Sequence, residues 1–307
     1  MRSALLAASR SVWLRERATR FGFVRRAVAR FMPGETIDDA LDAARQIRAG
    51  GITAIVTCLG ENVSSAAEAD AVADHYIGVL DRIRDGALDV QISVKLTHLG
   101  LDLGPDIAEA NLARIAHHAA STGNRVWIDM EDSSYTGATL DLFRSLRPRH
   151  EAIGVCLQAY LRRTDDDLTS LLPLGPSIRL VKGAYKEPAA VAFPRKADVD
   201  ENFHRLAARL LAVEARKKGA SVVFGTHDPV LISRLTQLAA STGAPRETYE
   251  FDLLYGIRRD QQEALARDGH RVRVLISYGS FWFPWYMRRL AERPANLWFV
   301  ARSVFLR

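Results

Sequence analysis

The segment RLVKGAYKE, at residues 179–187, places cationic and phenolic side chains at the end of an apolar run. Arg179 lies within that run, Lys182 ends it, and Gly183 lets the backbone pass close to a neighbouring group. Burying such charge is costly unless it is paired. Either carboxylates elsewhere in the chain or an anionic ligand must therefore neutralise this segment.

Further polar side chains follow other apolar runs of the chain. If these runs are strands of one parallel barrel, their carboxyl ends meet at one mouth, where cationic, histidine and tyrosine side chains surround several acids. Such a cluster favours an anionic ligand. Each residue taken singly also has a structural interpretation, such as a buried Lys95–Asp129 ion pair or a hydrogen-bonded core histidine at His227. The cluster comprises Glu61, Lys95, His98, Asp129, Glu131, Asp132, Gln158, Tyr160, Arg162, Arg163, Thr226, His227, Asp228, Glu250, Asp252, Tyr255 and Tyr278.

The acids of the segment DMED, residues 129–132, are also a candidate site for a divalent cation. Metal-dependent barrels usually supply histidine ligands as well, and no HxH pair accompanies this segment. We therefore expect no metal.

Eight short apolar runs alternate with amphipathic helical patterns from residue 36 onward. This alternation indicates a parallel sheet covered by helices. Eight such units predict an α/β fold of the (β/α)8 barrel type, with the active site at the carboxyl ends of the strands. No GxGxxG follows the first run, which argues against a dinucleotide-binding doubly wound sheet. The runs are ITAIVTCL (52–59), VQISVKL (90–96), RVWIDM (125–130), IGVCLQ (153–158), IRLVK (178–182), SVVFGT (221–226), TYEFDLL (248–254) and RVRVLIS (271–277).

The first helical pattern has a recognisable start and end. Thr36 is followed three residues later by Asp39, the arrangement of a capping box. The pattern stops at Gly50 and Gly51, which suit the end of a helix. We therefore expect a helix between Thr36 and Gly50.

Positive charge is concentrated at the N-terminus. The formal net charge is +6, and residues 1–34 alone hold eight arginines and one acid, so the body of the chain is near neutral. This amphipathic segment suits a helix packed on the barrel, a membrane-surface contact or a transit peptide. We predict a basic helical segment at 1–35, a catalytic barrel at 36–307 and no nucleic-acid partner.

The two cysteines, Cys58 and Cys156, lie in apolar runs. They indicate buried thiols in a reducing compartment, not a disulfide framework. No apolar run is long enough to span a bilayer. We expect a cytoplasmic protein, with peripheral contact on the inner face of the membrane as the alternative.

Several separate motifs, in their order along residues 30–300, resemble those of the proline dehydrogenase family. Because they fall on different strand ends, the resemblance is specific. The length suits the single-function bacterial type, which lacks a fused aldehyde dehydrogenase. The motifs are SVKLTHLGLDL (93–103), IDMED (128–132), YLRRT (160–164), RLVKGAY (179–185), THD (226–228), EFDLLYG (250–256) and a YG pair followed by RRLAE (288–292).

The resemblance implies a distorted (β/α)8 barrel whose last helix lies over the barrel mouth. It implies bound FAD and oxidation of L-proline to Δ1-pyrroline-5-carboxylate, by hydride transfer from C5 of proline to flavin N5. This is the first step of proline catabolism to glutamate, and the electrons then pass to a membrane quinone. The residues that would line the flavin are Gln158, Arg179, Val181, Lys182, Gly183, Thr226, His227 and Glu292.

The resemblance also implies a substrate pocket. Arg288 and Arg289 would clamp the proline carboxylate, although adjacent helical residues point about 100° apart and cannot form one flat fork. Glu61 would pair with Arg288 as a gate over bound proline, and Lys95 would pair with Asp129. The other pocket residues are Leu180, Ala184, Tyr185, Tyr278 and Trp285.

Three positions depart from the family pattern. Asp252 replaces a common glutamine, Phe281 replaces an aspartate before Trp282, and Trp285 replaces a tyrosine three residues before the paired arginines. The last change alters one wall of the pocket. Tyr278 stands at a position where, in the family, the residue disfavours a substrate ring that carries a hydroxyl group. This supports proline over 4-hydroxyproline as the substrate.

Three alternative functions remain open at this point. A dehydrogenase of 4-hydroxyproline or a related cyclic imino acid would use the same site. A Schiff-base aldolase, also a (β/α)8 barrel, would use Lys182 as its nucleophile. A basic, non-catalytic adaptor at the membrane surface, built on an inactive barrel, would bind lipid without turnover.

Overall fold

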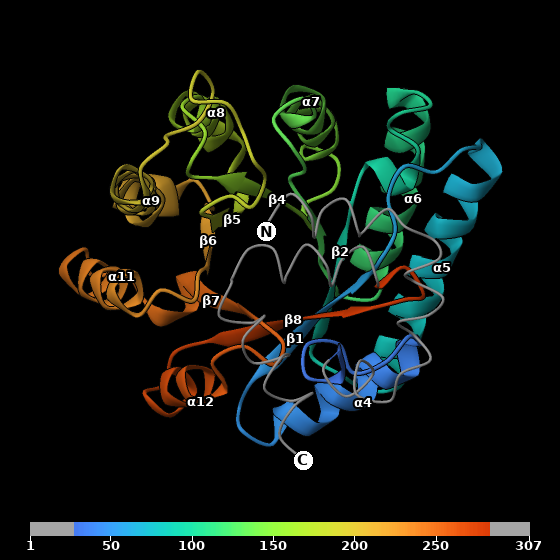
Figure 1. The fold of residues 1–307 in the computed structure, drawn as a ribbon, viewed down its shortest axis with the longest axis horizontal. Coiled ribbons are helices and arrows are strands. Elements are labelled where there is room, and N and C mark those ends of the chain that lie inside the picture. Colours follow the sequence, from blue (N-terminus) through green and yellow to red (C-terminus); the bar gives the residue numbers. More distant parts are fainter. Residues whose placement is uncertain (1–27, 283–307) are drawn as a thin grey trace, which may run out of the picture.

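The computed structural model of the chain describes residues 28–282. Within this part, eight parallel strands follow one another in sequence order and close into a barrel, with β8 hydrogen-bonded to β1 (Figure 1). The predicted (β/α)8 fold is therefore confirmed. The strands are β1 (Thr53–Cys58), β2 (Val90–Val94), β3 (Val126–Ile128), β4 (Ile153–Gln158), β5 (Ser177–Val181), β6 (Ser221–Gly225), β7 (Tyr249–Leu254) and β8 (Val272–Tyr278).

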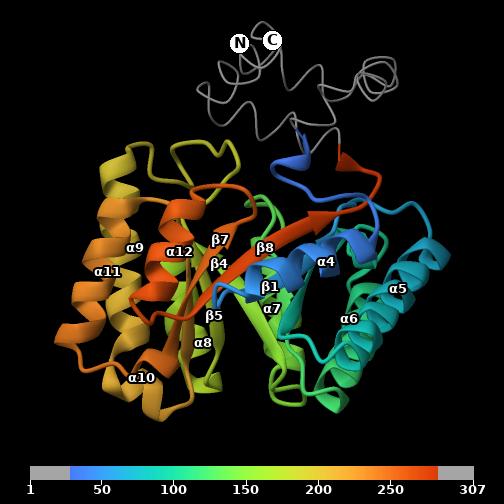
Figure 2. The same cartoon turned by 90° about the horizontal axis from the view of Figure 1, so that it is seen from below.

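Helices surround this barrel, as the side view in Figure 2 shows, with α9 and α11 on one flank and α5 and α6 on the other. The α-helices of the described part are α4 (Ile37–Arg48), α5 (Ala66–Asp85), α6 (Pro105–Ser121), α7 (Thr136–Leu146), α8 (Thr164–Leu171), α9 (Lys196–Leu211), α10 (Val213–Lys217), α11 (Pro229–Ser241) and α12 (Arg259–Arg267). Short 3₁₀ helices are η1 (Thr97–Leu99), η2 (Leu172–Leu174) and η3 (Arg246–Thr248).

Helix α4 begins with the predicted capping box. Thr36 Oγ1 accepts a hydrogen bond from the Asp39 amide at 3.2 Å, and Asp39 Oδ2 accepts one from the Thr36 amide at 3.0 Å. Both bonds satisfy amides that a helix start leaves without partners. The helix ends at Arg48, and Gly51 follows with a φ of +72°.

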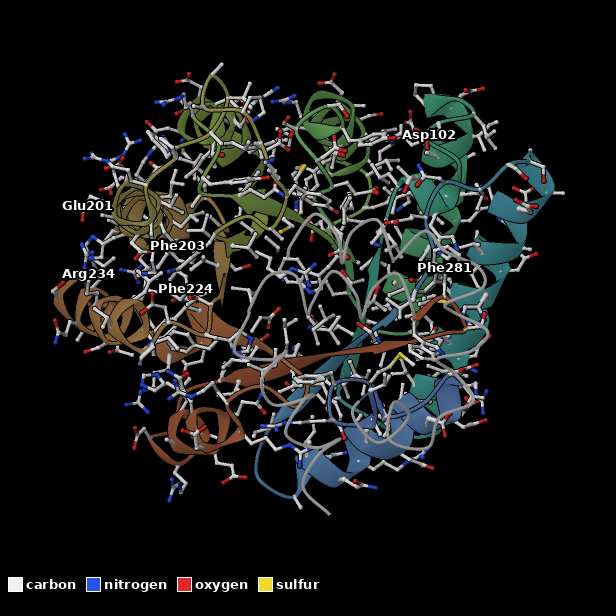
Figure 3. The ribbon with its side chains drawn as sticks, in the orientation of Figure 1. Asp102, Glu201, Phe203, Phe224, Arg234 and Phe281 are labelled. Carbon is white, nitrogen blue, oxygen red and sulfur yellow. The ribbon has the colours of Figure 1, made fainter. Side chains whose placement is uncertain are left out.

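The strands bury two different faces. The outer face packs against the helices, where Phe203 on α9 and Phe224 on β6 lie 6.3 Å apart between their ring centres (Figure 3). The inner face fills the lumen, where Ile55, Trp127, Val223 and Leu275 form a separate cluster. Only the lumen brings side chains of β1, β3, β6 and β8 together. Because successive side chains of a strand alternate between faces, this cluster identifies the inward positions.

The two ends of the described chain meet above the barrel. The Trp282 indole donates a hydrogen bond to Glu35 at 2.8 Å. Gly256, with a φ of +74°, lies directly against the backbone of Arg30 and Phe31, which leaves no room for a side chain at this position. The basic segment predicted at 1–35 falls mostly in residues 1–27, outside the described residues, so the domain boundary at residue 35 stays a prediction.

Both cysteines are free thiols, with Cys156 buried and Cys58 half-buried. Burial raises the pKa of the Cys156 thiol to about 11. Between residues 28 and 282, the structure contains no helix long and apolar enough to cross a membrane.

Candidate active site

Arg179 is the centre of the polar residues at the carboxyl ends of the strands. Its side chain is only 5% exposed, donates to Asp129, and donates to Ser93 Oγ at 2.8 Å. Its guanidinium carbon lies 5.4 Å from the centre of the Trp127 ring. Burial opposes the charged form, but the attraction of Asp129 raises the pKa of Arg179, so its charge is permanent. The expected buried charge is therefore present and paired within the protein.

The predicted ion pair between Lys95 and Asp129 is wrong. Lys95 Nζ lies 3.2 Å from Glu61 Oε2, in the loop after β1. Asp129 instead receives hydrogen bonds from Arg179 and from Ser93 Oγ, the latter at 2.8 Å. The long arginine side chain crosses the lumen to Asp129. Lys95 lies two residues beyond Ser93, nearer the mouth and beside the loop that carries Glu61.

Gln158, at the end of β4, is held by the backbone that follows β3. Its Nε2 donates to the carbonyls of Met130 and Glu131 at 3.2 and 3.0 Å. Glu131 in turn accepts from Thr97 Oγ1 at 2.7 Å, while burial raises the Glu131 pKa. Gln158 is thus fixed in one orientation at the junction of three strand ends.

Several buried polar atoms near this point have no hydrogen-bond partner among the described residues. Among them are Gln158 Oε1, an acceptor, and Arg179 Nη1, a donor that lies 3.8 Å from Asp252 Oδ2. Buried polar groups are normally satisfied, so these atoms indicate a ligand with both donor and acceptor groups. The polar edge of a flavin ring has this character, and the residues present therefore fit the cofactor that the motifs imply.

Lys182, directly after β5, is enclosed by acids. Its Nζ donates to Asp200 and, at 2.9 Å, to Asp228 Oδ2, and Lys196 contacts the same two carboxylates. Burial opposes ionisation of Asp228, but hydrogen bonds from Lys196 and Lys182 lower its pKa well below the usual range. Lys182 is therefore bound by two carboxylates, Asp200 and Asp228. The geometry therefore gives no support to the Schiff-base aldolase, whose nucleophile must be a neutral amine.

His227 and Thr226 follow β6, as expected. The Leu254 amide donates to His227 Nε2 at 3.0 Å, so the neutral ring carries its proton on Nδ1 and presents it as a donor. Thr226 is buried, and its hydroxyl accepts from the Asp228 amide at 3.2 Å. Both side chains are held by backbone groups of the strand ends.

Gly183 closes against the Tyr160 ring. Its φ is +111°, and a Cβ atom built there would overlap that ring. Ala184 and Tyr185 follow it on the exposed rim of the barrel mouth, while Val181 and Lys182 are half-buried. The close approach expected at this glycine is thus confirmed, and the group that it faces is Tyr160.

Gly183→Ala should lower the free energy of unfolding by about 1–3 kcal/mol, because the new side chain is strained in this conformation. Gly78→Ala is the matched control. Gly78 lies within α5 with open space around its Cβ position, and alanine there should raise stability by about 1 kcal/mol. Denaturant unfolding of both variants measures the effects, and equal stabilities would contradict the assigned clash.

Two predicted pocket residues face the wrong side of the barrel. Tyr278 is buried in the outer layer, where its hydroxyl lies 2.7 Å from His75 Nε2 on α5. Leu180 belongs to the same outer core, between Arg179 and Val181. Strand alternation explains both errors, because Arg179 and Leu275 occupy the inward positions of β5 and β8. Tyr278 therefore does not support proline over 4-hydroxyproline.

Sequence reasoning missed three inward residues beside Arg179. Ser93 binds both Arg179 and Asp129, Trp127 stacks on Arg179, and Leu275 packs on Trp127 in the lumen cluster. Alternation was the available signal, since Trp127 lies two residues before Asp129. Trp285, Arg288, Arg289 and Glu292 lie outside the described residues, so their predicted roles stay predictions.

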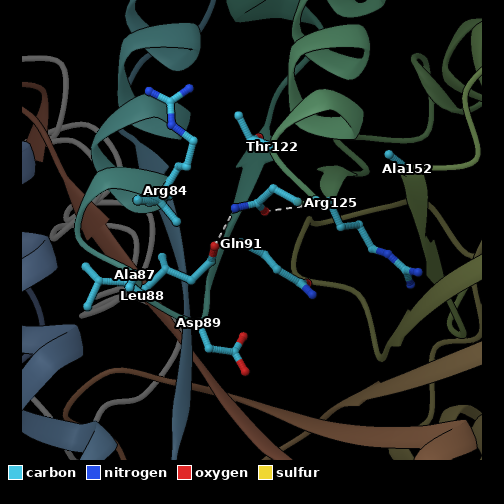
Figure 4. Close-up of a pocket in the computed structure, with 12 residues that line it drawn as sticks. Arg84, Ala87, Leu88, Asp89, Gln91, Thr122, Arg125 and Ala152 are labelled. Carbon is cyan, nitrogen blue, oxygen red and sulfur yellow. Dashed lines mark hydrogen bonds between the residues drawn. The ribbon is translucent and has the colours of Figure 1, made fainter.

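A separate cavity of about 500 Å³ lies at the opposite end of the strands (Figure 4). Its lining includes Arg84 near the end of α5, Asp89 and Gln91 at the start of β2, and Arg125 before β3. None of the predicted site residues lines it. It therefore lies apart from the polar residues at the barrel mouth.

Comparison with known proteins identifies the family. The family model described as proline dehydrogenase matches residues 40–302. Proline dehydrogenase 1 of Bacillus subtilis (strain 168) is 38% identical over 304 residues, covering 99% of both chains. Proline dehydrogenase of Deinococcus radiodurans is 38% identical over 280 residues, covering 90% of this chain and 89% of its own.

A solved structure agrees with these matches. Proline utilization A from Bdellovibrio bacteriovorus, inactivated by N-propargylglycine, superposes with a TM-score of 0.82 at 25% identity. The match covers 92% of this chain and 34% of that longer protein, so the chain spans about a third of it. The chain therefore belongs to the proline dehydrogenase family.

Proposed function

We propose that this chain oxidises L-proline to Δ1-pyrroline-5-carboxylate with bound FAD. Its membership in the proline dehydrogenase family makes it an oxidoreductase that acts on proline. The observation that carries the finer proposal is Arg179, a permanent cation in the lumen with one buried donor, Nη1, that has no hydrogen-bond partner among the described residues.

FAD would supply the acceptor for the hydride that leaves C5 of proline. Arg179 would place a fixed positive charge beside the flavin, which favours the state that has gained electrons. Gln158 would bind the polar edge of the ring, and Ser93 and Asp129 would hold Arg179 in place. The remaining proposed contacts of the cofactor are Val181, Lys182, Gly183, Thr226, His227 and Glu292.

The proposed substrate pocket lies at the exposed rim. Ala184 and Tyr185 would contact the proline ring, with Trp285 as a further wall, and Arg288 and Arg289 would bind its carboxylate. Lys95 would contribute positive charge, although Glu61 already neutralises part of it. Exclusion of water by these side chains would strengthen each electrostatic contact.

Spectroscopy and activity together test the proposal. The purified chain should be yellow and release FAD on denaturation. L-proline should drive reduction of an artificial dye acceptor, and 4-hydroxy-L-proline at the same concentration measures the alternative substrate. Faster turnover of 4-hydroxy-L-proline would replace the proposed substrate within the same site.

We also propose a quinone as the electron acceptor and a cytoplasmic location with peripheral membrane contact. The arginine-rich residues 1–34 support contact with anionic lipid, at up to ~1 kcal/mol for each cation near the surface.

Glu61 is proposed to close the site through Arg288. In the structure Glu61 lies 3.2 Å from Lys95, and the next residue, Asn62, donates to Asp102 at 2.7 Å. The Tyr135 hydroxyl donates to the same Asp102 at 2.8 Å, so three loops brace this position. Glu61 is therefore held at the rim, where an arginine bound to substrate could meet it.

Glu61→Gln should slow the reduction of the bound flavin by proline about tenfold while changing proline affinity less, because the gate acts in the closed site. Stopped-flow bleaching of the flavin measures both constants. Glu263→Gln, an exposed glutamate on α12, is the control and should change neither. Losses that are fully additive in the Glu61→Gln/Arg288→Ala double variant would contradict the gate.

A further inference from the structure

Two buried arginines of the barrel lumen are each paired with an acid. Arg273 on β8 is 2% exposed and forms two contacts with Glu250, Nε–Oε1 at 2.8 Å and Nη2–Oε2 at 3.4 Å. Arg179 is paired with Asp129, as described above. Both guanidinium groups therefore already have a carboxylate partner, and Asp252 is a third acid in the same lumen.

Asp252 has no donor for either carboxylate oxygen. Its side chain is 6% exposed, and both Oδ1 and Oδ2 are buried without a hydrogen-bond partner among the described residues. Its strand neighbours in register are Gly225, which has no side chain, and Arg273, which Glu250 occupies. The nearest cation is Arg179 Nη1, 3.8 Å from Oδ2, which is too long for a hydrogen bond.

An ionised Asp252 would have no hydrogen bond to stabilise its charge, and its nearest cation would be Arg179 at 3.8 Å. Burying a charge without hydrogen bonds is far more costly than burying the neutral acid. The charged groups that face Asp252 are Glu250 on its own strand, Arg179 on β5, Arg273 on β8 and Asp129 after β3. Burial first, and then the negative charge of Glu250, raise the pKa of Asp252 to about 7, against the opposing pull of Arg179.

We propose that Asp252 is a positioning residue that stays protonated in the barrel lumen. With Asp252 neutral, Arg179 directs its Nη1 donor to the cofactor site instead of to Asp252. The effect of Asp252 on the cofactor site rests on the proposed function, whereas the claim that Asp252 is protonated does not. A neutral Asp252 leaves Nη1 of Arg179 without a charged competitor. An ionised Asp252 would attract that group and cancel part of the positive charge next to the cofactor.

The proton on Asp252 links stability to pH with a definite sign. The folded-state pKa lies above the value of about 4 expected in the unfolded chain, so folding takes up a proton between these values. The contribution of Asp252 to the stability of the folded chain should therefore fall as the pH rises from about 4 to about 7, and should not change further above that range.

Asp252→Asn tests this first half, because asparagine has the shape of the neutral acid and cannot ionise. The melting temperature of the wild type minus that of the variant should fall as the pH rises towards about 7 and then level off. Asp89→Asn is the control, since Asp89 is a lumen-end acid whose side chain is 58% exposed and lies 3.0 Å from Arg273. The melting temperature of the wild type minus that of Asp89→Asn should show no such fall with pH.

Infrared spectroscopy of the wild type covers the case in which the variant fails to fold. A carbonyl band of a buried, protonated carboxyl group should be present at about pH 5.5 and absent at about pH 8.5. Absence of this band at the lower pH, or parallel stability curves for wild type and Asp252→Asn, would overturn the protonated acid.

The second half is read from the redox potential of the bound flavin. The potential of the wild type should fall below that of Asp252→Asn as the pH passes about 7, because ionised Asp252 then opposes Arg179. A constant offset between the two potentials would overturn the positioning role even if the stability arm succeeds. A protein that binds no flavin would contradict the proposed function, while the stability and infrared arms still decide the state of Asp252.

Discussion

Replacing Arg179 with methionine should slow the reduction of bound flavin by proline by about 100-fold or more. Removal of one fixed electrostatic group next to developing charge typically costs ~2.7–4 kcal/mol in the transition state. Methionine retains most of the packing length and removes the charge. Stopped-flow absorbance under anaerobic conditions measures this rate directly.

The same variant should also be less stable, by about 3–5 kcal/mol, because Asp129 loses its buried cationic partner. Arg234→Met is the matched control. Arg234 on α11 pairs with Glu201 on α9 at 2.8 Å on the outer surface (Figure 3), where the loss should be under ~1 kcal/mol. Equal effects of the two substitutions on flavin reduction would remove Arg179 from the proposed site.

Replacing Arg288 or Arg289 with alanine should lower the catalytic efficiency with proline by about 30-fold or more. Loss of a desolvated partner for a charged group costs ~2–5 kcal/mol. The flavin content of Arg288→Ala should remain that of the wild type, since the proposed contact is with substrate. Steady-state kinetics with a dye acceptor measures the loss.

Prolinamide, which lacks the carboxylate, separates a clamp from a general defect. The wild type should strongly prefer proline to prolinamide, and each arginine variant should lose most of this preference. A variant that loses activity equally with both compounds would show that the arginine does not bind the carboxylate.

The architecture was readable from the sequence because apolar runs and helical patterns alternate throughout. Each predicted strand differs from the observed one by at most two residues at either end. The capping box at Thr36 and Asp39 was likewise predicted, because it depends on local spacing alone. Strand order then placed Arg179, Gln158 and His227 at one mouth, since parallel strands of a barrel share a direction.

The sequence does not predict which side chains contact one another across the barrel. Lys95 and Asp129 lie at adjacent strand ends, but the reach of Arg179 across the lumen decides which cation Asp129 meets. Tyr278 was assigned to the pocket by motif similarity, whereas the alternation on β8 directs it to α5. The sequence marks Asp252 as unusual, but it does not show that the carboxylate lacks hydrogen-bond donors. That follows from the strand register, which places Gly225 and Arg273 beside Asp252.

Anaerobic titration of the purified protein with L-proline tests the central claim most directly. The account predicts a yellow protein whose flavin absorbance bleaches in proportion to the proline added, with formation of an equal amount of Δ1-pyrroline-5-carboxylate. A colourless protein, or a flavin that proline leaves oxidised, would contradict it.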